Sequence, residues 1–207
     1  MLDLIIRNGK CYIDGELKEV DVAIKDKKIH QIGQISEEAK ETIDASGHTV
    51  LPGCIDTQTH FREPGSTDTE DLHSGSRAAI AGGITSVFEM PNTNPPTSNK
   101  KEFQRKLDLA KNRMYCNYAF YFGATAENAD DLASLKDLEG CCGIKLFAGS
   151  STGNLLVAEE DDIDKVFQNA SKVVAVHSED EAILKENKKL IKQGDIHTPP
   201  VWRSAEC

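Results

Sequence analysis

The sequence predicts an α/β protein with two parts: a small β module over residues 1–52, and a longer segment over residues 53–207 in which strands alternate with helices. Two observations support this prediction. Short strand-like runs dominate the first part. Beyond Leu51, apolar runs recur about every 30 residues with helical stretches between them, which is the rhythm of a parallel βα sheet.

The first part consists mainly of short strand-like runs. Asp26-Lys27 supplies a turn between two of them, which predicts a hairpin. Ser46-Gly47 forms a second turn inside the last run, and a polar stretch near 37–40 is the helical candidate of this part. In chain order, the strand-like runs are residues 4–6, 20–24, 28–33 and 42–50.

The second part contains five predicted strand–helix units. They can begin a barrel or belong to an open, doubly wound sheet. No glycine-rich phosphate-binding motif follows a strand, which argues against a nucleotide-binding open sheet. The strands centre near Ile55, Val87, Ala119, Ile144 and Ala175. The helices are predicted over residues 71–81, 99–112, 127–135, 160–171 and 180–193.

Composition excludes some functions and partners. The 207 residues carry a formal net charge of -10, which repels a phosphate backbone and argues against nucleic acid as a partner. Apolar runs are far shorter than the roughly 20 residues of a membrane helix. The N-terminus lacks a basic leader followed by an apolar stretch, so we expect no signal peptide and a cytoplasmic protein. The six cysteines fit no CxxC metal pattern.

Polar residues follow several of the apolar runs. In a βα barrel, active-site groups project from the C-terminal ends of the strands. Gln58 and His60 come after the first run and lie two residues apart, so on an extended strand their side chains point the same way. Arg62 follows them and offers a planar fork suited to a carboxylate. Asn92 comes after the second run and can both donate and accept hydrogen bonds.

Two more polar residues occupy the later strands. Lys145 lies inside an apolar run, where burial of a cation is costly and favours the neutral, reactive amine. His177 ends the fifth run. Each residue also has a structural interpretation: a strand-end histidine is often structural, a strand lysine is often paired, and Glu179 and Asp180 suit the first turn of a helix. Their coincidence at successive strand ends nevertheless indicates a metal site.

Five motifs carry a resemblance to a known family. IDTQTHFREPG at 55–65 resembles the first-strand signature of dihydroorotases, within the amidohydrolase superfamily, and MPNT at 90–93 resembles a loop of theirs. GIKLF with GSSTG at 143–153 resembles the segment that carries their carboxylated lysine. HSED at 177–180 and VWRSAE at 201–206 are similar to their fifth strand end and the loop that follows. The resemblance implies the first five strands of a TIM-type (β/α)8 barrel, preceded by a small β-sandwich.

The resemblance also implies roles for individual residues. His60 and His177 would be zinc ligands, and Lys145 would be carboxylated and bridge two metal ions. Arg62 and Asn92 would hold the substrate carboxylate. One departure stands out: the family has HxH on the first strand, whereas this chain has Gln58, whose amide oxygen is a weaker zinc ligand than imidazole. One or two zinc ions are therefore both consistent with the sequence.

The function implied by the resemblance is interconversion of L-dihydroorotate and N-carbamoyl-L-aspartate in pyrimidine (UMP) biosynthesis. Allantoinase and dihydropyrimidinase activities are alternatives, because these enzymes share the fold and the metal chemistry. A further alternative is a non-catalytic scaffold that associates with aspartate transcarbamoylase, which Gln58 suggests; homo-oligomers are equally compatible with the sequence.

The family pattern extends past the end of this sequence. About three more barrel strands, another histidine ligand and the aspartate that acts as general base would lie beyond residue 207. We therefore expect the 207-residue chain alone to fold poorly or to associate, and not to turn over substrate.

Overall fold

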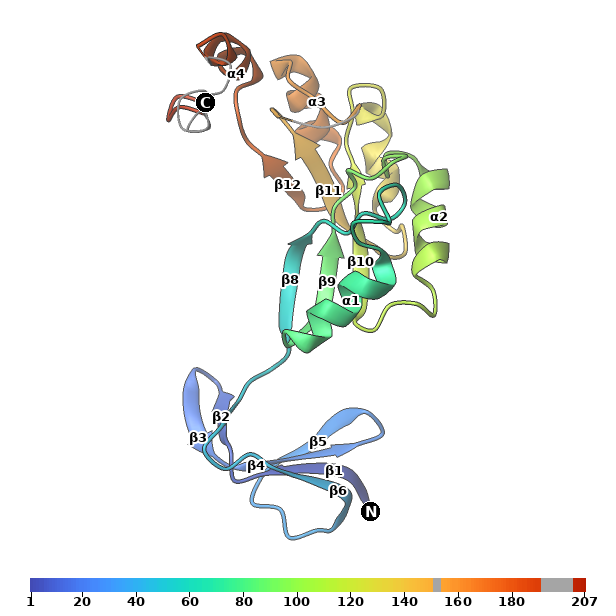
Figure 1. Cartoon of the computed structure of the whole chain (residues 1–207). Coiled ribbons are helices and arrows are strands. Elements are labelled where there is room, and N and C mark those ends of the chain that lie inside the picture. Colours follow the sequence, from blue (N-terminus) through green and yellow to red (C-terminus); the bar gives the residue numbers. More distant parts are fainter. Residues whose placement is uncertain (151–153, 191–202) are drawn as a thin grey trace. The chain divides into compact units, whose positions relative to one another are not determined.

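The chain forms two compact units, Met1–Gly53 and Cys54–Cys207. The computed structural model describes residues 1–150, 154–190 and 203–207. Figure 1 shows that the first unit consists of strands, whereas strands and helices alternate in the second. Within the described residues, no helix is both long and apolar enough to cross a membrane.

The first unit contains two small β-sheets. A four-stranded sheet has the order β5-β4-β1-β6, in which β1 is antiparallel to β4 and parallel to β6. A three-stranded sheet has the order β3-β2-β7. A small apolar core comprises Leu2, Ile5, Ala23 and Ile35. The strands are β1 (Leu2–Arg7), β2 (Lys10–Ile13), β3 (Glu16–Glu19), β4 (Asp21–Lys25), β5 (Lys28–Gly33), β6 (Ala39–Asp44) and β7 (Thr49–Val50).

Turn residues determine much of this pairing. The β4–β5 hairpin confirms the predicted one, and Asp26 and Lys27 both have positive φ angles, as its two-residue turn requires. The run over 42–50 divides at the predicted Ser46-Gly47 turn into β6 and β7, which belong to different sheets. The helical candidate near 37–40 was wrong, since Ala39 begins β6 and pairs with Leu2.

The β2–β3 hairpin was not predicted. Its turn is Asp14-Gly15, with φ angles of 52° and 85°. An Asp-Gly pair between two alternating runs is among the strongest hairpin signals in a sequence. The signal was therefore present, but polar residues dominate the flanking strands, so hydrophobic periodicity did not reveal it.

The second unit contains a five-stranded parallel sheet with the order β12-β11-β10-β9-β8. Each strand lies beside the one that precedes it in the sequence. In a doubly wound sheet the strand order reverses at a switch point. The order observed here has no such reversal, which excludes that alternative and confirms the prediction of an incomplete TIM-type barrel. The strands are β8 (Cys54–Thr59), β9 (Ile84–Glu89), β10 (Asn117–Gly123), β11 (Cys141–Phe147) and β12 (Val174–His177).

Helices connect these strands close to where they were predicted. One differs in type, because the stretch predicted as a helix over 127–135 forms a 3-10 helix, η1. The last helix was predicted to reach residue 193, but α4 ends earlier, and residues 191–193 lie outside the described part of the chain. The helices are α1 (Leu72–Ala81), α2 (Lys100–Ala110), η1 (Ala129–Leu135), α3 (Glu160–Asn169) and α4 (Glu181–Lys188).

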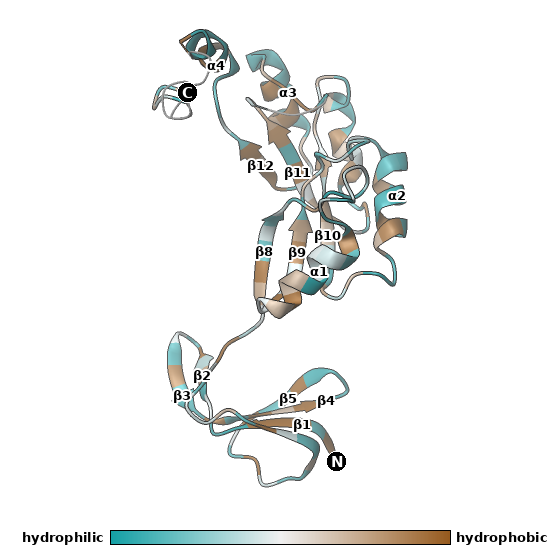
Figure 2. Ribbon diagram, in the orientation of Figure 1, coloured by the Kyte–Doolittle hydropathy of each residue, from teal (hydrophilic) through white to brown (hydrophobic). Residues whose placement is uncertain are grey.

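The main core lies between this sheet and its helices. Phe103 of α2 is fully buried, and its ring centroid lies 6.4 Å from that of Phe120 and 6.2 Å from that of Phe122. Figure 2 shows β11 as a largely hydrophobic strand and α2 as a helix with both hydrophilic and hydrophobic parts. This packing fixes α2 against β10. The loop that connects β9 to α2 therefore ends on a well-anchored helix.

Candidate active site

Most of the predicted site residues lie at the C-terminal edge of the parallel sheet. Thr59, the last residue of β8, is in register with Glu89, the last residue of β9. At the other end of the strand order, Phe147, the last residue of β11, is in register with His177, the last residue of β12. Because the strands are parallel, the residues that follow them emerge at one edge. The fold therefore brings the predicted strand-end residues to a common edge.

His60 and Asn92 are in direct contact. The Nδ1 atom of His60 lies 2.8 Å from Oδ1 of Asn92. With the amide oxygen as acceptor, His60 carries its proton on Nδ1 and presents Nε2 as a lone-pair donor. A ring held in this way is typical of metal-binding histidines, whose other nitrogen donates to a carbonyl or carboxylate.

The pKa of His60 is lowered, chiefly because burial disfavours the charged imidazolium. The hydrogen bond that His60 donates to Asn92 opposes this effect, while the positive charges of Arg62, Lys145 and Lys106 add to it. His60 is therefore held in the neutral form that a metal ion requires.

Arg62 and Asn92 line one cavity of about 450 Å³. The loop after β8 is held there by two backbone hydrogen bonds, from the Arg62 N–H to the Glu70 carbonyl (3.2 Å) and from the Asn94 N–H to the Pro64 carbonyl (3.0 Å). Oδ1 of Asn92 faces His60, so Nδ2 remains to donate to a ligand. A guanidinium and an amide N–H beside one cavity suit a carboxylate. The remaining lining residues are Pro64, Ser66, Thr93, Asn94 and Pro96.

Lys145 is buried within β11, with 2% of its surface exposed. Burial lowers its pKa. Its ammonium group lies 4.9 Å from the centroid of the Phe147 ring. Within the described residues no carboxylate forms an ion pair with Lys145, so this amine is set apart from the buried Lys106, which does have an acidic partner.

His177 contacts Glu179 through Nε2. Glu179 also forms an ion pair with Arg203, whose Nε lies 3.0 Å from Oε1. The interpretation of Glu179 as a first-turn acid of the helix was wrong, because its carboxylate turns back to His177. Asp180 does serve the helix: its side chain accepts a hydrogen bond from the Ile183 N–H of α4. His177 offers Nδ1 as its second ring nitrogen.

Gln58 is exposed on β8, where its backbone N–H donates to Asp56 Oδ1 at 2.9 Å. No group of three or more His, Cys, Asp or Glu side chains suited to a metal ion exists in the described part of the chain. The predicted donor set differs from such a group, since it combines two histidines with Lys145 and Gln58. These donors suit zinc when Lys145 carries an added carboxylate, because the buried amine then becomes an anionic oxygen ligand.

Two acid–base pairs near the site were not predicted. Glu89, at the end of β9, contacts Lys106 of α2, and both side chains are fully buried. Glu63 forms a bidentate pair with Arg113, with nitrogen–oxygen distances of 2.7 and 3.1 Å. Neither pair has a sequence signal, because their partners are distant along the chain and belong to different elements.

Two motifs of the resemblance lie partly outside the described residues: GSSTG lacks 151–153, and VWRSAE lacks 201–202. Within VWRSAE, the described Arg203 contacts Glu179 and donates from Nη2 to the Ser150 hydroxyl at 2.6 Å. Arg203 therefore links this part of the chain to the end of β12.

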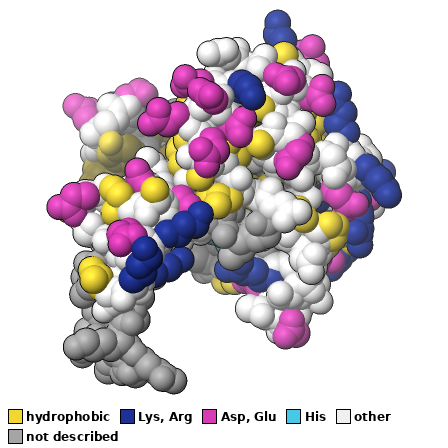
Figure 3. Space-filling model, turned by 90° about the horizontal axis from the view of Figure 1, so that it is seen from above, with side chains coloured by type: hydrophobic (Ala, Val, Ile, Leu, Met, Phe, Trp, Pro, Cys, Tyr) yellow, Lys and Arg dark blue, Asp and Glu magenta, His cyan; other side chains and the backbone are white. Residues whose placement is uncertain are grey.

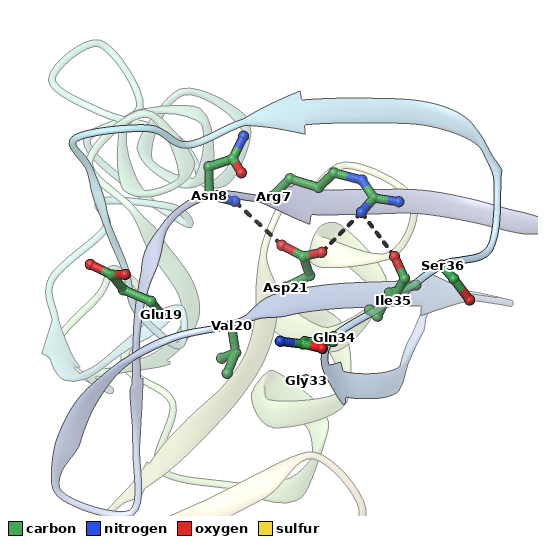
Figure 4. A pocket seen from close by; sticks show the side chains of 9 residues that line it. All are labelled: Arg7, Asn8, Glu19, Val20, Asp21, Gly33, Gln34, Ile35 and Ser36. Carbon is green, nitrogen blue, oxygen red and sulfur yellow. Dashed lines mark hydrogen bonds and ion pairs between the residues drawn. The ribbon is translucent and has the colours of Figure 1, made fainter.

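A second cavity of about 740 Å³ lies in the first unit (Figure 4). Arg7 lines this cavity and donates to Asp21 Oδ2 and to the Ile35 carbonyl. Asp21 also accepts from the Asn8 N–H. Since these charged groups satisfy one another, the cavity is better explained as part of the module's own framework than as a ligand site.

Acidic side chains are spread over the face seen in Figure 3, in agreement with the net charge of -10. Lys and Arg side chains lie among them in the same view.

The amidohydrolase family profile matches residues 49–203, most of the chain. The chain belongs to the amidohydrolase family. Members of this family generally use a metal ion, which agrees with the donor set described above. The match also agrees with the parallel strand order.

Among amidohydrolases, a dihydroorotase from Methanosarcina mazei is 35% identical over 200 residues, which are 95% of this chain and 43% of the relative. An allantoinase from Escherichia coli is 37% identical over 190 residues, covering 87% of this chain and 42% of the relative. The chain thus spans less than half the length of these relatives. Similarity to dihydroorotases confirms the predicted resemblance.

The structure of an L-hydantoinase (dihydropyrimidinase) from Arthrobacter aurescens superimposes with a TM-score of 0.89 at 28% identity, over 99% of this chain and 47% of that protein. Overall similarity therefore points to the cyclic-amide hydrolases as a group. It does not separate their substrates, for which individual residues must be considered.

Proposed function

We propose that this amidohydrolase chain provides part of the active site of a dihydroorotase, which interconverts L-dihydroorotate and N-carbamoyl-L-aspartate in pyrimidine biosynthesis. The observation that carries the proposal is the shared cavity of Arg62 and Asn92 beside His60. L-dihydroorotate bears a carboxylate next to its cyclic amide, whereas allantoin and hydantoin do not. Of these three compounds, dihydroorotate is therefore the one whose carboxylate can pair with the Arg62 guanidinium.

We propose that His60, His177 and carboxylated Lys145 hold one or two zinc ions, with Gln58 as an additional donor. Zinc at these ligands would supply a hydroxide at neutral pH and polarise the amide carbonyl. The chain's own residues have separate tasks. Arg62 binds the substrate carboxylate away from the reacting bond and so fixes its orientation. Asn92 holds the His60 ring and donates from Nδ2 to the same carboxylate.

Carboxylation of Lys145 is consistent with its surroundings. A neutral amine attacks carbon dioxide, a C–N bond forms and one proton is released, which leaves an anionic carbamate. Burial already favours the neutral amine, and within the described residues no acidic side chain pairs with the cation. The low pKa and the lack of an acidic partner both support the modification.

Substrate assays on the protein that contains this chain test the proposal. Dihydroorotate should be hydrolysed much faster than allantoin or hydantoin. Arg62→Gln should raise KM for dihydroorotate roughly 10- to 100-fold, because a charge-assisted hydrogen bond is lost. Ser66→Ala, which alters the same cavity without removing a charge, is the matched control and should change KM little. Faster turnover of allantoin, with no effect of Arg62→Gln, would refute the proposal.

Allantoinase activity is the enzymatic alternative, favoured by the 37% identity to an allantoinase. A non-catalytic scaffold that binds aspartate transcarbamoylase is a third proposal, motivated by Gln58. Elemental analysis of the parent protein and of Gln58→His separates the non-catalytic scaffold from a metal-dependent hydrolase. About two zinc ions in the parent would support a binuclear hydrolase, and one ion rising to two in the variant would support a mononuclear site. No metal in either protein would favour the scaffold.

A further inference from the structure

The buried contact between Glu89 and Lys106 lies directly behind the loop that carries Asn92. Glu89 ends β9, and Lys106 projects from the middle of α2. Both side chains are 0% exposed, and Lys106 is the partner that the described residues supply for the carboxylate. The Lys106 ammonium also donates to the Met90 carbonyl at 3.0 Å and lies 5.2 Å from the centroid of the Phe120 ring.

The peptide groups of Met90 are thus held on two sides. Its N–H donates to the Thr59 carbonyl of β8 at 2.9 Å, and its carbonyl accepts from Lys106. Asn92 follows two residues later and accepts a hydrogen bond from His60, which follows Thr59 directly. A short chain of contacts therefore runs from Lys106 through Met90 to the pair formed by His60 and Asn92.

A buried ion pair is an expensive way to hold two elements together. Burial raises the pKa of Glu89 to about 8, against the opposing effect of Lys106, and burial also lowers the pKa of Lys106. Apolar side chains of similar volume at such positions are often as stabilising or more so. Stability alone therefore does not account for this pair, whereas a donor aimed at a backbone carbonyl has no apolar substitute.

We propose that Lys106 is a positioning residue of the site, which holds the Met90–Asn92 turn so that Asn92 accepts the hydrogen bond from His60. Glu89 contacts the same Lys106 amine and holds it in the position from which it donates to the Met90 carbonyl. The inference concerns the geometry around His60 and is independent of which cyclic amide the protein hydrolyses. This role of Lys106 goes beyond the proposed dihydroorotase function and does not depend on it.

Three variants of the protein that contains this chain test the inference. Lys106→Met removes the donor and leaves a buried carboxylate. The double variant Glu89→Leu/Lys106→Met removes both charges and the donor together. Val166→Ala, in the core position of α3 that is fully buried, is the control for a loss of stability away from this loop. The measurements are the denaturation midpoint, the exchange rate of the Met90 amide, and the NMR signal of the His60 Nδ1–H proton.

We expect the double variant to regain the midpoint that Lys106→Met loses. Its Met90 amide should nevertheless exchange roughly tenfold or more faster than in the parent chain, and its His60 Nδ1–H signal should broaden or disappear. Val166→Ala should lower the midpoint and leave the His60 signal unchanged. A double variant with parental Met90 exchange and a parental His60 signal would show that the pair serves stability alone, and would overturn the inference. The double variant carries the test even where Lys106→Met does not fold.

Discussion

At the scale of single residues, Lys145 and Lys106 are two buried lysines with different surroundings. Lys106 has the Glu89 carboxylate and the Met90 carbonyl as partners. Lys145 lies beside the Phe147 ring, and no carboxylate pairs with it among the residues that the structure describes. The difference is chemical: a paired lysine has its charge compensated, whereas burial without an anion favours the neutral, reactive amine.

This difference predicts opposite effects on stability and metal binding at Lys145. Lys145→Met should stabilise the metal-free chain by about 1 kcal/mol, because a costly buried amine is replaced by an apolar side chain of similar length. The same variant should lose zinc binding. Urea denaturation in the presence of a chelator and a competition titration with a zinc-binding dye measure the two effects.

Lys145→Arg is the matched control for that prediction. It keeps a cation but forms no carbamate, so it should lose zinc binding without any gain in stability. Parental zinc affinity in either variant would remove Lys145 from the ligand set.

At the scale of elements, α1 illustrates how a helix start fixes the loop before it. Asp71 is its N-cap and accepts a hydrogen bond from the Ser74 N–H at 2.6 Å, while the Asp71 N–H donates to the Ser74 hydroxyl at 3.0 Å. The Leu72 N–H donates to Glu63, which Arg113 also holds. The start of α1 therefore anchors the segment that carries Arg62.

The cap predicts a dependence of stability on acid. Hydrogen bonds from Ser74 lower the pKa of Asp71 from 3.8. Because the folded value lies below the unfolded one, the charged cap contributes its full stability above pH 3.8, and this contribution is lost as the pH falls through the folded pKa. Asp71→Ala should cost about 1 kcal/mol at neutral pH, and Asp71→Asn should lose less stability than the parent on acidification.

Urea denaturation of these variants between pH about 2.5 and 7 measures the effect. Asp164→Asn on the exposed part of α3 is the comparison and should behave like the parent chain. A parental acid response in Asp71→Asn would assign the acid sensitivity to other carboxylates.

At the scale of the whole molecule, the two compact units have separate cores. In the first unit, Arg7 ties β1 to Asp21 of β4 and to the Ile35 and Glu37 carbonyls. Its guanidinium thus joins three segments that are distant in sequence. Val166 is a buried residue in the core of the second unit.

Separate cores predict separate responses to mutation. Arg7→Met should destabilise the first unit by about 1–2 kcal/mol, because charge-assisted hydrogen bonds are lost and Asp21 keeps less compensation. Amide hydrogen exchange should accelerate in β1 and β4 and stay at parental rates in β10. Val166→Ala should give the reverse pattern. Equal acceleration in both units for either variant would show that they unfold as one cooperative body.

The sequence predicted those features that depend on local pattern. Strand and helix positions in the second unit followed from hydrophobic periodicity, and the β4–β5 hairpin followed from its turn residues. The type of η1 was missed, because its local hydrogen bonds are those of a 3-10 helix and the pattern of apolar residues does not separate the two helix types. The placement of β6 and β7 was missed because strand pairing is not a local property.

The sequence by itself determined the alternation of strands and helices, the residues at each strand end and the family to which the chain belongs. Only the tertiary structure decided which side chains meet: His60 with Asn92, Glu179 with His177, and Lys106 with Glu89. The physical reason is that periodicity records which face of an element is buried. Contacts between side chains depend on how separate elements pack, and that arrangement exists only in the folded chain.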